Sequence, residues 1–351
     1  MPGGRAGGHS VDVLIVSLGS TQGLRTADEQ LGASLERAGA RVALARTQAP
    51  APVRTLMLTD LAWARSARTA AARVLAQLRD APPRAIVYSS TTAALLWPRR
   101  GAIRFDAPAA GNRPSRHGLW QRPLESRRLA QAPLLLPWSE GAIEEAPAAL
   151  REARALVLPV AVASSGPPAP RRDIAAITYA ANPAKKGLGR VLEAWRRLCA
   201  TGPPPGELVV AGAAAEEIEH AGLAAGGAGV RVVGALAREE YRALLRRARV
   251  FVCAPRREDY GIAQLEALAD GCLLVTTPAP GPYAALALAR ALDQRLVGED
   301  LVASLRSALE DPSAGYAERA REALAPFGAE AIDRLVAEQV LPRLLGEAPQ
   351  L

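Results

Sequence analysis

The chain has 351 residues, 49% of them hydrophobic, and a formal net charge of +8. This length exceeds one ordinary domain, so we expect two domains, each with its own core. No uncharged apolar run of 18 residues is present and the three cysteines lie far apart, which excludes an ordinary transmembrane helix and a cysteine-rich zinc site.

The basic residues are scattered, and only 4% of the residues are aromatic. Nucleic-acid partners that stack bases on aromatic side chains are therefore not expected, whereas peripheral contact with an anionic membrane stays open. Sparse, unpaired cysteines are typical of a reducing compartment, so we expect a cytoplasmic protein. Residues 1–10 are rich in glycine and lack an apolar core, which predicts a disordered tail and no signal peptide.

The N-terminal domain is expected over residues 11–160. Its first strand is predicted over residues 11–18, and a capping-box pattern at Thr26 and Glu29 predicts the start of a helix that ends at Gly39. Strands that alternate with helices predict a parallel sheet with helices on both faces. Further strands are expected over 41–45, 85–88, 103–105 and 134–136, further helices over 56–79 and 119–131, and an irregular polar loop over 106–118.

Residues 161–173 are rich in proline, serine and alanine and predict a linker. A second α/β domain follows over 174–325, and residues 326–351 are expected to form a C-terminal helix that packs back on the N-terminal domain. Two doubly wound domains place a ligand crevice at the carboxyl ends of their strands. The expected strands are 174–179, 207–211, 230–233, 250–253 and 273–276, and the expected helices include 188–199, 301–309, 316–324 and 331–345.

The first candidate site is the run from Arg257 to Leu268, which follows an apolar strand and opens a helix. Gly261 permits a tight turn, and the amides of Ile262 and Ala263 then lie at a helix N-terminus, which favours a diphosphate. Glu266 lies one turn further and can accept hydrogen bonds from a ribose diol, while Glu258 precedes the turn. The alternative is a helix N-terminus that carries acids only for its dipole.

The second candidate site is the segment Asn182-Pro-Ala-Lys185-Lys186-Gly187, which follows a strand and opens a helix. Lys185 and Lys186 are the only lysines among 43 basic residues, and Asn112 and Asn182 are the only asparagines. A lysine at the carboxyl end of a strand offers a compact positive charge to the phosphates of a departing nucleotide. A solvated lysine pair is the alternative, although a cation at a helix N-terminus is mildly unfavourable.

The N-terminal half carries weaker candidates for holding an acceptor. The loop from Gly19 to Arg25 follows the first strand, at the edge where a crevice is expected. A polar loop later in the domain could bind an anionic acceptor, or could be an ordinary solvent-facing loop. Its candidate residues are Asp106, Asn112, Arg113, Arg116 and His117.

The order of these motifs from about residue 156 to 325 resembles the donor half of glycosyltransferase family 4. The segments that carry the resemblance are Lys186-Gly187, Leu208–Gly212, Val232–Gly234, Glu258–Glu266 and Gly271–Thr277. The resemblance implies a GT-B fold, two Rossmann-like domains that face a central cleft, and transfer from a nucleotide-diphosphate sugar, mostly with retention of configuration.

The resemblance also implies residue roles. Lys186 would contact the diphosphate together with the amides of Gly261 to Ala263, Glu258 would contact the transferred sugar, and Glu266 the ribose. Gly234-Ala-Leu236 would lie near the base. The family usually has an arginine shortly before its lysine, where this chain has Ala180-Ala181-Asn182, so Lys185 is a candidate replacement. The acid that often follows Thr277 in the family is also missing here.

The expected reaction is sugar transfer without metal or cofactor, because no Asp-x-Asp motif or carboxylate/histidine cluster at metal spacing is present. The donor is expected to be a UDP or GDP sugar, and the acceptor a sugar, a lipid-linked sugar or another small molecule. Two alternatives stay open. One is a sugar-nucleotide epimerase of similar fold, against which the presence of only three histidines counts. The other is a non-catalytic nucleotide-binding module.

Overall fold

The chain forms two compact units in a computed structural model, which describes residues 10–51, 53, 55–113, 118–146, 154–167, 169–202 and 205–347. Unit 1 comprises residues up to 161 together with those from 329 onward, and unit 2 comprises residues 162–328. The segment expected as a linker therefore belongs to unit 2 from Val162 onward. Of the expected N-terminal tail, only Ser10 lies within the described residues.

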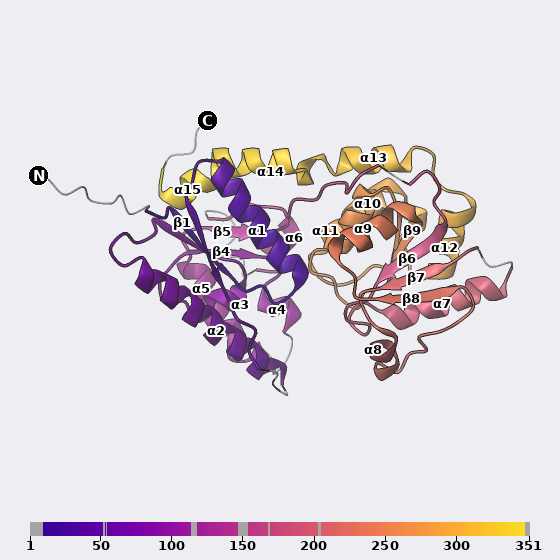
Figure 1. The fold of residues 1–351 in the computed structure, drawn as a ribbon, viewed down its shortest axis with the longest axis horizontal. Coiled ribbons are helices and arrows are strands. Elements are labelled where there is room, and N and C mark those ends of the chain that lie inside the picture. The colour runs from indigo at the N-terminus through magenta and orange to yellow at the C-terminus, as the bar shows by residue number, and fades with distance from the viewer. Residues whose placement is uncertain are drawn as a thin grey trace, which may run out of the picture. The chain divides into compact units, whose positions relative to one another are not determined.

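Unit 1 is built around a five-stranded parallel sheet with the order β2-β1-β3-β4-β5 (Figure 1). Its strands are β1 (Val13–Ser17), β2 (Val42–Arg46), β3 (Ala85–Tyr88), β4 (Ala102–Phe105) and β5 (Leu135–Pro137). Its helical elements are α1 (Gln22–Arg37), α2 (Leu56–Gln77), α3 (Thr91–Ala94), α4 (Ala109–Asn112), α5 (Gln121–Gln131), α6 (Glu140–Glu144), α14 (Ala329–Leu335), the π-helical turn η5 (Val336–Val340) and α15 (Leu341–Leu345).

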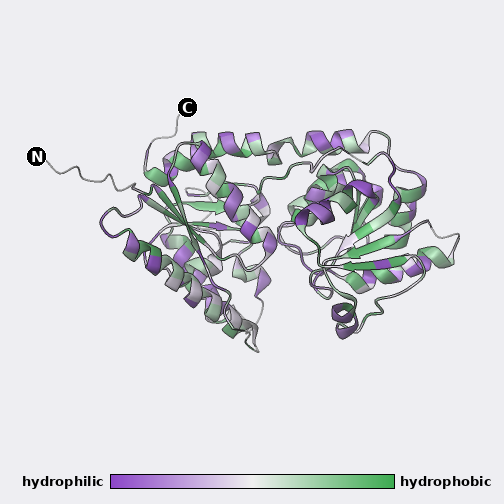
Figure 2. Cartoon of the chain, viewed as in Figure 1, coloured by the Kyte–Doolittle hydropathy of each residue, from purple (hydrophilic) through white to green (hydrophobic). Residues whose placement is uncertain are grey.

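Both faces of this sheet are buried, because successive side chains of a strand point to opposite sides and helices cover each side. Leu14 and Val16 pack in one hydrophobic cluster, which includes Ala67 and Ala71 of α2. Val13 and Ile15 pack in a second cluster on the other face. The strands are accordingly almost uniformly hydrophobic, and they appear green in Figure 2.

The C-terminal segment completes the second of these clusters. Ile332, Val336, Val340 and Leu341 pack there with the residues of β1 and α1. Arg37 of α1 also donates two hydrogen bonds of 2.7 Å to the Asp333 carboxylate of α14. The last described residues are therefore part of the core of unit 1, although unit 2 separates them from it in the sequence.

Unit 2 contains a second five-stranded parallel sheet, with the order β10-β9-β6-β7-β8. Its strands are β6 (Ile174–Tyr179), β7 (Leu208–Ala211), β8 (Val230–Gly234), β9 (Ala248–Cys253) and β10 (Leu273–Thr276). Its helices are α7 (Leu188–Ala200), α8 (Ala215–His220), α9 (Arg238–Arg247), α10 (Ile262–Ala269), α11 (Ala284–Leu292), α12 (Leu301–Glu310) and α13 (Tyr316–Ala323), with short turns at η3 (Gln294–Leu296) and η4 (Ala325–Phe327).

Several local expectations from the sequence are wrong. Helix α1 begins at Gln22 and is capped by Thr21, whose hydroxyl accepts from the Leu24 amide at 3.2 Å, so Thr26 and Glu29 lie inside the helix. The loop expected over 106–118 contains the short helix α4. The C-terminal helix is not one regular helix, since a π-helical turn interrupts it. Within the described residues, no helix combines the length and the apolarity needed to cross a membrane.

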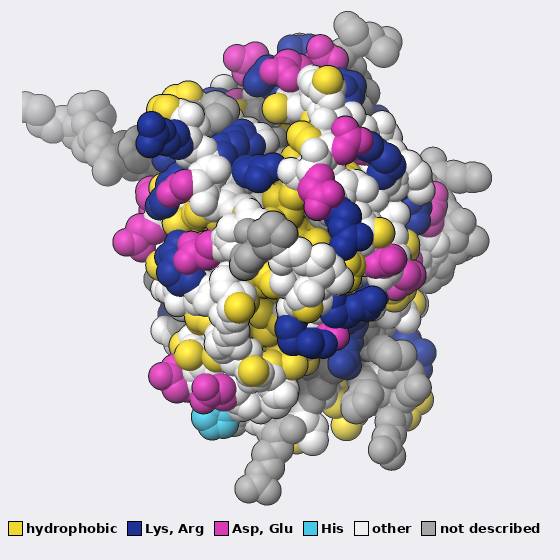
Figure 3. Space-filling view, turned by 90° about the vertical axis from the view of Figure 1, so that its right-hand side faces the viewer, with side chains coloured by type: hydrophobic (Ala, Val, Ile, Leu, Met, Phe, Trp, Pro, Cys, Tyr) yellow, Lys and Arg dark blue, Asp and Glu magenta, His cyan; other side chains and the backbone are white. Residues whose placement is uncertain are grey.

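Charged side chains of both signs are interspersed on the face of the molecule drawn in Figure 3. Exposed arginines of unit 2 form ion pairs such as Arg231–Glu207 at 2.8 Å and Arg247–Asp173 at 2.5 Å. Such exposed pairs contribute little to stability individually.

Candidate functional site

The strand order of unit 2 identifies the place where a ligand site is expected. From β6 the chain winds outward through β7 and β8, and it then returns to the other side of β6 to form β9 and β10. In open α/β sheets, ligands bind outside the carboxyl ends of the strands at the point where this order reverses. In unit 2 that point lies between β6 and β9. The two sequence motifs follow these two strands.

Two lysine–acid pairs join the loops that follow β6 and β9. The Lys186 Nζ lies 2.6 Å from the Glu258 Oε2, and the Lys185 Nζ lies 3.4 Å from the Asp259 Oδ2. The Lys186 and Glu258 side chains are 24% and 8% exposed, whereas the Lys185 side chain is half exposed. The Arg256 amide also donates to the Lys185 carbonyl at 3.0 Å. The two motifs therefore form one site.

Close backbone approach in this site requires glycine. Gly187 has φ +66°, and a Cβ atom added there would lie 1.8 Å from the Ala254 carbonyl oxygen. Gly261 has φ +95° and caps α10, and a Cβ atom there would meet the Tyr283 ring at 3.1 Å. The first amides of α10, at Ile262 and Ala263, have no partner within the helix, as at every helix N-terminus. These amides can bind an anion.

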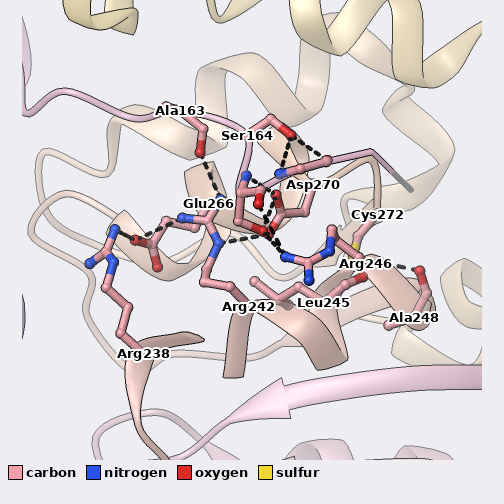
Figure 4. A network of polar contacts seen from close by, with 12 residues as sticks. Ala163, Ser164, Arg238, Arg242, Leu245, Arg246, Ala248, Glu266, Asp270 and Cys272 are labelled. Atoms are coloured by element: carbon pink, nitrogen blue, oxygen red, sulfur yellow. Dashed lines mark hydrogen bonds and ion pairs between the residues drawn. The ribbon is translucent and has the colours of Figure 1, made fainter. Parts of the chain in front are cut away.

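Glu266, the candidate ribose ligand, belongs to a network of ion pairs (Figure 4). Its Oε1 lies 2.5 Å from the Arg238 Nη2 and 3.2 Å from the Arg242 Nη1. Arg242 is 5% exposed and also binds the Asp270 carboxylate at 2.6 Å, whereas Arg238 is 36% exposed. Glu266 is thus held by one buried and one accessible arginine, a pairing not expected from the sequence.

The same network holds the start of unit 2. Arg242 donates to the Ala163 carbonyl at 2.7 Å, and the Ser165 amide donates to the Asp270 carboxylate at 2.7 Å (Figure 4). Removing one charged residue from this buried network would destabilise the protein, because its partner would keep an uncompensated charge. The residues around Glu266 are therefore rigidly supported.

The remaining candidates in unit 2 shape the backbone of the site. The Asn182 Oδ1 accepts from the Lys185 amide at 2.9 Å, which fixes the turn that carries the lysines. Gly234 has φ +71°, and its carbonyl accepts from the Gly212 amide at 2.7 Å. Leu236 is half buried between β8 and α9. These positions do not contribute a charge.

A buried chain of hydrogen bonds, which was not expected from the sequence, supports Glu258. Gln264 Nε2 donates to the Glu258 Oε2 at 3.2 Å and to the Tyr283 hydroxyl at 3.3 Å. The Tyr283 hydroxyl lies 2.7 Å from the Thr276 Oγ1 and 3.6 Å from the Cys253 sulfur. Burial raises the pKa of the Tyr283 phenol well above its usual value, and it also raises the pKa of the Cys253 thiol. Both groups therefore stay protonated at neutral pH.

Unit 1 contains a cavity of about 200 Å³ beside the ends of β1 and β2. Gly19 and Arg25 line it, as does Trp63, which the sequence analysis did not select. The Arg25 Nη1 donates to the Gly19 carbonyl at 2.8 Å. The hydroxyl of Thr47 is buried without a hydrogen-bond partner among the described residues. The cavity is lined by Ser17, Gly19, Arg25, Glu29, Leu44, Arg46, Thr47, Ala49 and Trp63.

The other candidates of unit 1 do not line this cavity. Arg113 binds the Asp60 carboxylate of α2 through two bonds of 2.6 and 3.0 Å and also the Asn112 carbonyl. Asp106 accepts from the Ala107 amide at 2.9 Å. Arg116 and His117 lie outside the described residues. Within the described residues, Arg113 thus joins the predicted polar loop to α2.

No cluster of three or more metal-ligating side chains is found within the described ranges.

Residues 163–325 match the model of the family "Glycosyl transferases group 1". Among solved structures, the glycosyltransferase WaaG of lipopolysaccharide biosynthesis is similar over 96% of this chain and 100% of its own, with 16% identity and a TM-score of 0.67. A trehalose-6-phosphate structure from E. coli bound with UDP-2-fluoro glucose is similar over 97% and 100%, with 13% identity and a TM-score of 0.62. No curated protein matches significantly.

The fold is shared more widely. A putative UDP-N-acetylglucosamine 2-epimerase from Listeria monocytogenes is similar over 97% of this chain and 98% of its own, with 12% identity and a TM-score of 0.64. At such identities the structural likeness shows the fold alone, which is GT-B, with two parallel-sheet Rossmann-like domains. Together with the family match over unit 2, it supports sugar transfer, and the chain is a glycosyltransferase.

Proposed function

We propose that the chain transfers a hexosyl or related sugar from a nucleotide-diphosphate sugar bound by unit 2 to an acceptor bound by unit 1. The observation that carries this proposal is the Lys186–Glu258 pair, 2.6 Å apart where the loops after β6 and β9 meet. A primary ammonium has three donors, and Glu258 uses one of them. Lys186 can therefore bind a phosphate oxygen while it remains paired with Glu258.

Catalysis in such a site consists of positioning and of stabilising charge as the nucleoside diphosphate departs. Lys186 and the amides of Ile262 and Ala263 supply positive potential, and Lys185 is accessible as a second cation. Glu258 would bind the transferred sugar, and Glu266 the ribose. We propose that transfer retains the anomeric configuration by attack on the same face, as the resemblance to glycosyltransferase family 4 implies.

The cavity of unit 1 suggests the chemistry of the acceptor. Trp63 lines it and can contribute apolar contact to a sugar. Arg25 can donate to a phosphate or carboxylate, and Arg46 lies beside it, paired with the lining Glu29 at 3.2 Å. We therefore propose an anionic sugar-like acceptor, free or lipid-linked. A lipid-linked acceptor would be met at the cytoplasmic face of an anionic membrane, and the net charge of +8 favours that encounter.

Transfer is proposed to require no metal ion, because the lysines and the helix amides can neutralise the leaving group. Turnover measured with and without excess EDTA checks this proposal. We expect equal rates, and an EDTA-treated enzyme that recovers activity only with magnesium or manganese would contradict it.

The proposed function is tested by a thermal-shift screen of the full chain with UDP, GDP, ADP and their sugars. A ligand at 100 times its dissociation constant should add about 2.7 kcal/mol of stability. The binding nucleotide sugar is then incubated alone. Slow release of the nucleoside diphosphate supports a transferase, interconversion of epimeric sugars would indicate an epimerase, and binding without either reaction would indicate a non-catalytic module.

A further inference from the structure

Glu258 is held by two donors that converge on one of its two oxygens. Lys186 Nζ at 2.6 Å and Gln264 Nε2 at 3.2 Å both bind the Glu258 Oε2. No hydrogen bond to the Oε1 is found in the part of the chain that the structure describes, and the Glu258 side chain is 8% exposed. The carboxylate is therefore oriented, with a single oxygen left for a ligand.

Gln264 is itself oriented by groups on the far side from Glu258. Its side chain is almost fully buried, and its amide also donates to the Tyr283 hydroxyl at 3.3 Å. That hydroxyl can donate onward to the Thr276 Oγ1 at 2.7 Å. The Tyr283 ring occupies the space beside Gly261 that a Cβ atom would otherwise need, which fixes the ring against the turn. The amide of Gln264 therefore has little rotational freedom.

The residues in contact with one another come from three different loops and one helix of unit 2. Lys186 follows β6, Glu258 follows β9, Gln264 lies in the first turn of α10, and Tyr283 follows β10. The loop of Tyr283 also contacts Glu258 through its backbone, since the Glu258 amide donates to the Pro280 carbonyl at 3.1 Å and the Tyr283 amide to the Glu258 carbonyl at 3.3 Å. Both the backbone and the side chain of Glu258 are thus fixed by the segment after β10.

We propose that Gln264, supported by Tyr283, is a positioning residue that presents the Glu258 Oε1 to a hydroxyl of the donor sugar and so sets which sugar is accepted. The inference rests on the proposed function, in which Glu258 binds the transferred sugar. Lys186 alone could not fix the orientation, because an ammonium rotates freely and will also bind phosphate. The planar amide keeps the carboxylate oriented while Lys186 also binds the leaving group.

The test uses three full-length variants, Gln264→Leu, Gln264→Glu and Tyr283→Phe, with UDP, UDP-glucose and UDP-galactose as probes. Should the nucleotide screen select GDP, then GDP, GDP-mannose and GDP-glucose are used. Gln294→Leu, the same change at an exposed glutamine, is the matched control. For each variant we measure the dissociation constant of the nucleoside diphosphate, and kcat and KM for each sugar nucleotide.

We expect Gln264→Leu to bind UDP within about twofold of the parent and to lose roughly 10- to 100-fold in kcat, as is usual when a partner that orients a ligand-binding side chain is removed. The ratio of kcat/KM between the two epimeric sugars should fall toward one. Tyr283→Phe keeps the ring and should show the same change to a smaller extent. The carboxyl of Gln264→Glu can donate only when protonated, so its activity optimum should move to lower pH.

Unchanged kcat and sugar preference in Gln264→Leu, with UDP binding intact, would overturn the inference while leaving the proposed function in place. Equal losses of UDP affinity and turnover would also overturn it, because they would indicate a general structural role. If the parent binds no sugar nucleotide at all, the proposed function fails and this inference fails with it.

Discussion

Lys186 is the residue on which the proposed chemistry depends most. If it neutralises the departing diphosphate, its charge matters more in the transition state than in the ground state. Lys186→Ala should therefore lower turnover by about a hundredfold or more, with a smaller loss of donor affinity. Steady-state kinetics and calorimetric binding of the nucleoside diphosphate separate the two effects.

Two further variants give this experiment its controls. Lys186→Arg should restore turnover only partly, because a planar guanidinium does not replace a compact ammonium paired with Glu258. Lys185→Ala should have a milder effect, since Lys185 is half exposed and lies 3.4 Å from Asp259. Binding and turnover within twofold of the parent in Lys186→Ala would show that the lysine pair is a solvated surface feature.

Gly187 offers a prediction that concerns the architecture of the site. An added Cβ atom would collide with the Ala254 carbonyl, whereas at Gly222, which also has a positive φ, nothing lies within 4 Å. Gly222→Ala should cost only about 1 kcal/mol, the usual penalty of a left-handed conformation. Gly187→Ala should cost about 1–3 kcal/mol more, because the two loops must separate. Urea unfolding of both variants measures the difference, and equal values would contradict the predicted loop contact.

At the scale of elements, Glu125 of α5 makes the free energy of unfolding depend on pH. Its Oε1 accepts from the Ala109 amide of α4 at 2.7 Å, and its neighbours include Thr91, Arg113 and Asp60. Burial raises the pKa of this carboxyl from 4.5 to about 7. The folded state then binds the proton more tightly than the unfolded state. Its contribution to stability is full below about pH 4.5 and is lost as the pH rises through about 7.

Glu125→Gln should remove this dependence, because an amide does not ionise. Relative to the parent, we expect the variant to gain up to roughly 3 kcal/mol between pH 4.5 and pH 8, as an upper limit from the pKa shift. Melting temperatures at several pH values, compared with those of the exposed control Glu318→Gln, check this. Burial raises the pKa of Asp28 to about 6. Asp28 therefore adds the same pH dependence of stability to the parent, to Glu125→Gln and to Glu318→Gln. A parent and variant with parallel profiles would contradict the prediction.

The elements also show what the sequence could predict. Strands β1 and β6 are apolar on both faces and were placed to within one or two residues at each end, because burial on both sides leaves a continuous hydrophobic run. The cap of α1 was misplaced because Thr21 and Thr26 both fit a capping residue, and only the packing of the preceding loop selects between them. The four-residue helices α3 and α4 carry too little periodicity to be recognised.

Those parts of the candidate site whose conformation depends on the local sequence were predictable. Gly187 and Gly261 adopt positive φ in loops where the sequence alone favours tight turns. The pairing of Glu266 with Arg238 and the support of Glu258 by Tyr283 join residues 28 and 25 positions apart, respectively, and such partners depend on how the strands associate. Trp63 was missed because a half-buried aromatic residue on an amphipathic helix is indistinguishable from a core residue in the sequence.

At the scale of the whole molecule, unit 2 should bind the nucleotide alone. Lys186, Glu258 and Glu266, with their supporting partners, all lie within residues 162–328. A fragment comprising these residues should therefore bind the same nucleoside diphosphate as the full chain, with an affinity within about tenfold, one decade corresponding to 1.4 kcal/mol. Calorimetric titration of both proteins measures this. A folded fragment without affinity, beside a full chain that binds, would show that unit 1 supplies essential donor contacts.

The return of the C-terminal segment to unit 1 has a consequence for the synthesis of the protein. The ribosome releases all of residues 162–328 before Ile332 and Val336 emerge, so unit 2 can fold while one face of the first sheet still lacks part of its cover. Unit 2 behaves in this respect like a domain inserted into another, and its ends meet, since the Val162 amide donates to the Phe327 carbonyl at 2.8 Å. A chain truncated after residue 328 should thus hold a folded unit 2 together with an incompletely covered unit 1, and it should be a better chaperone substrate than the full chain.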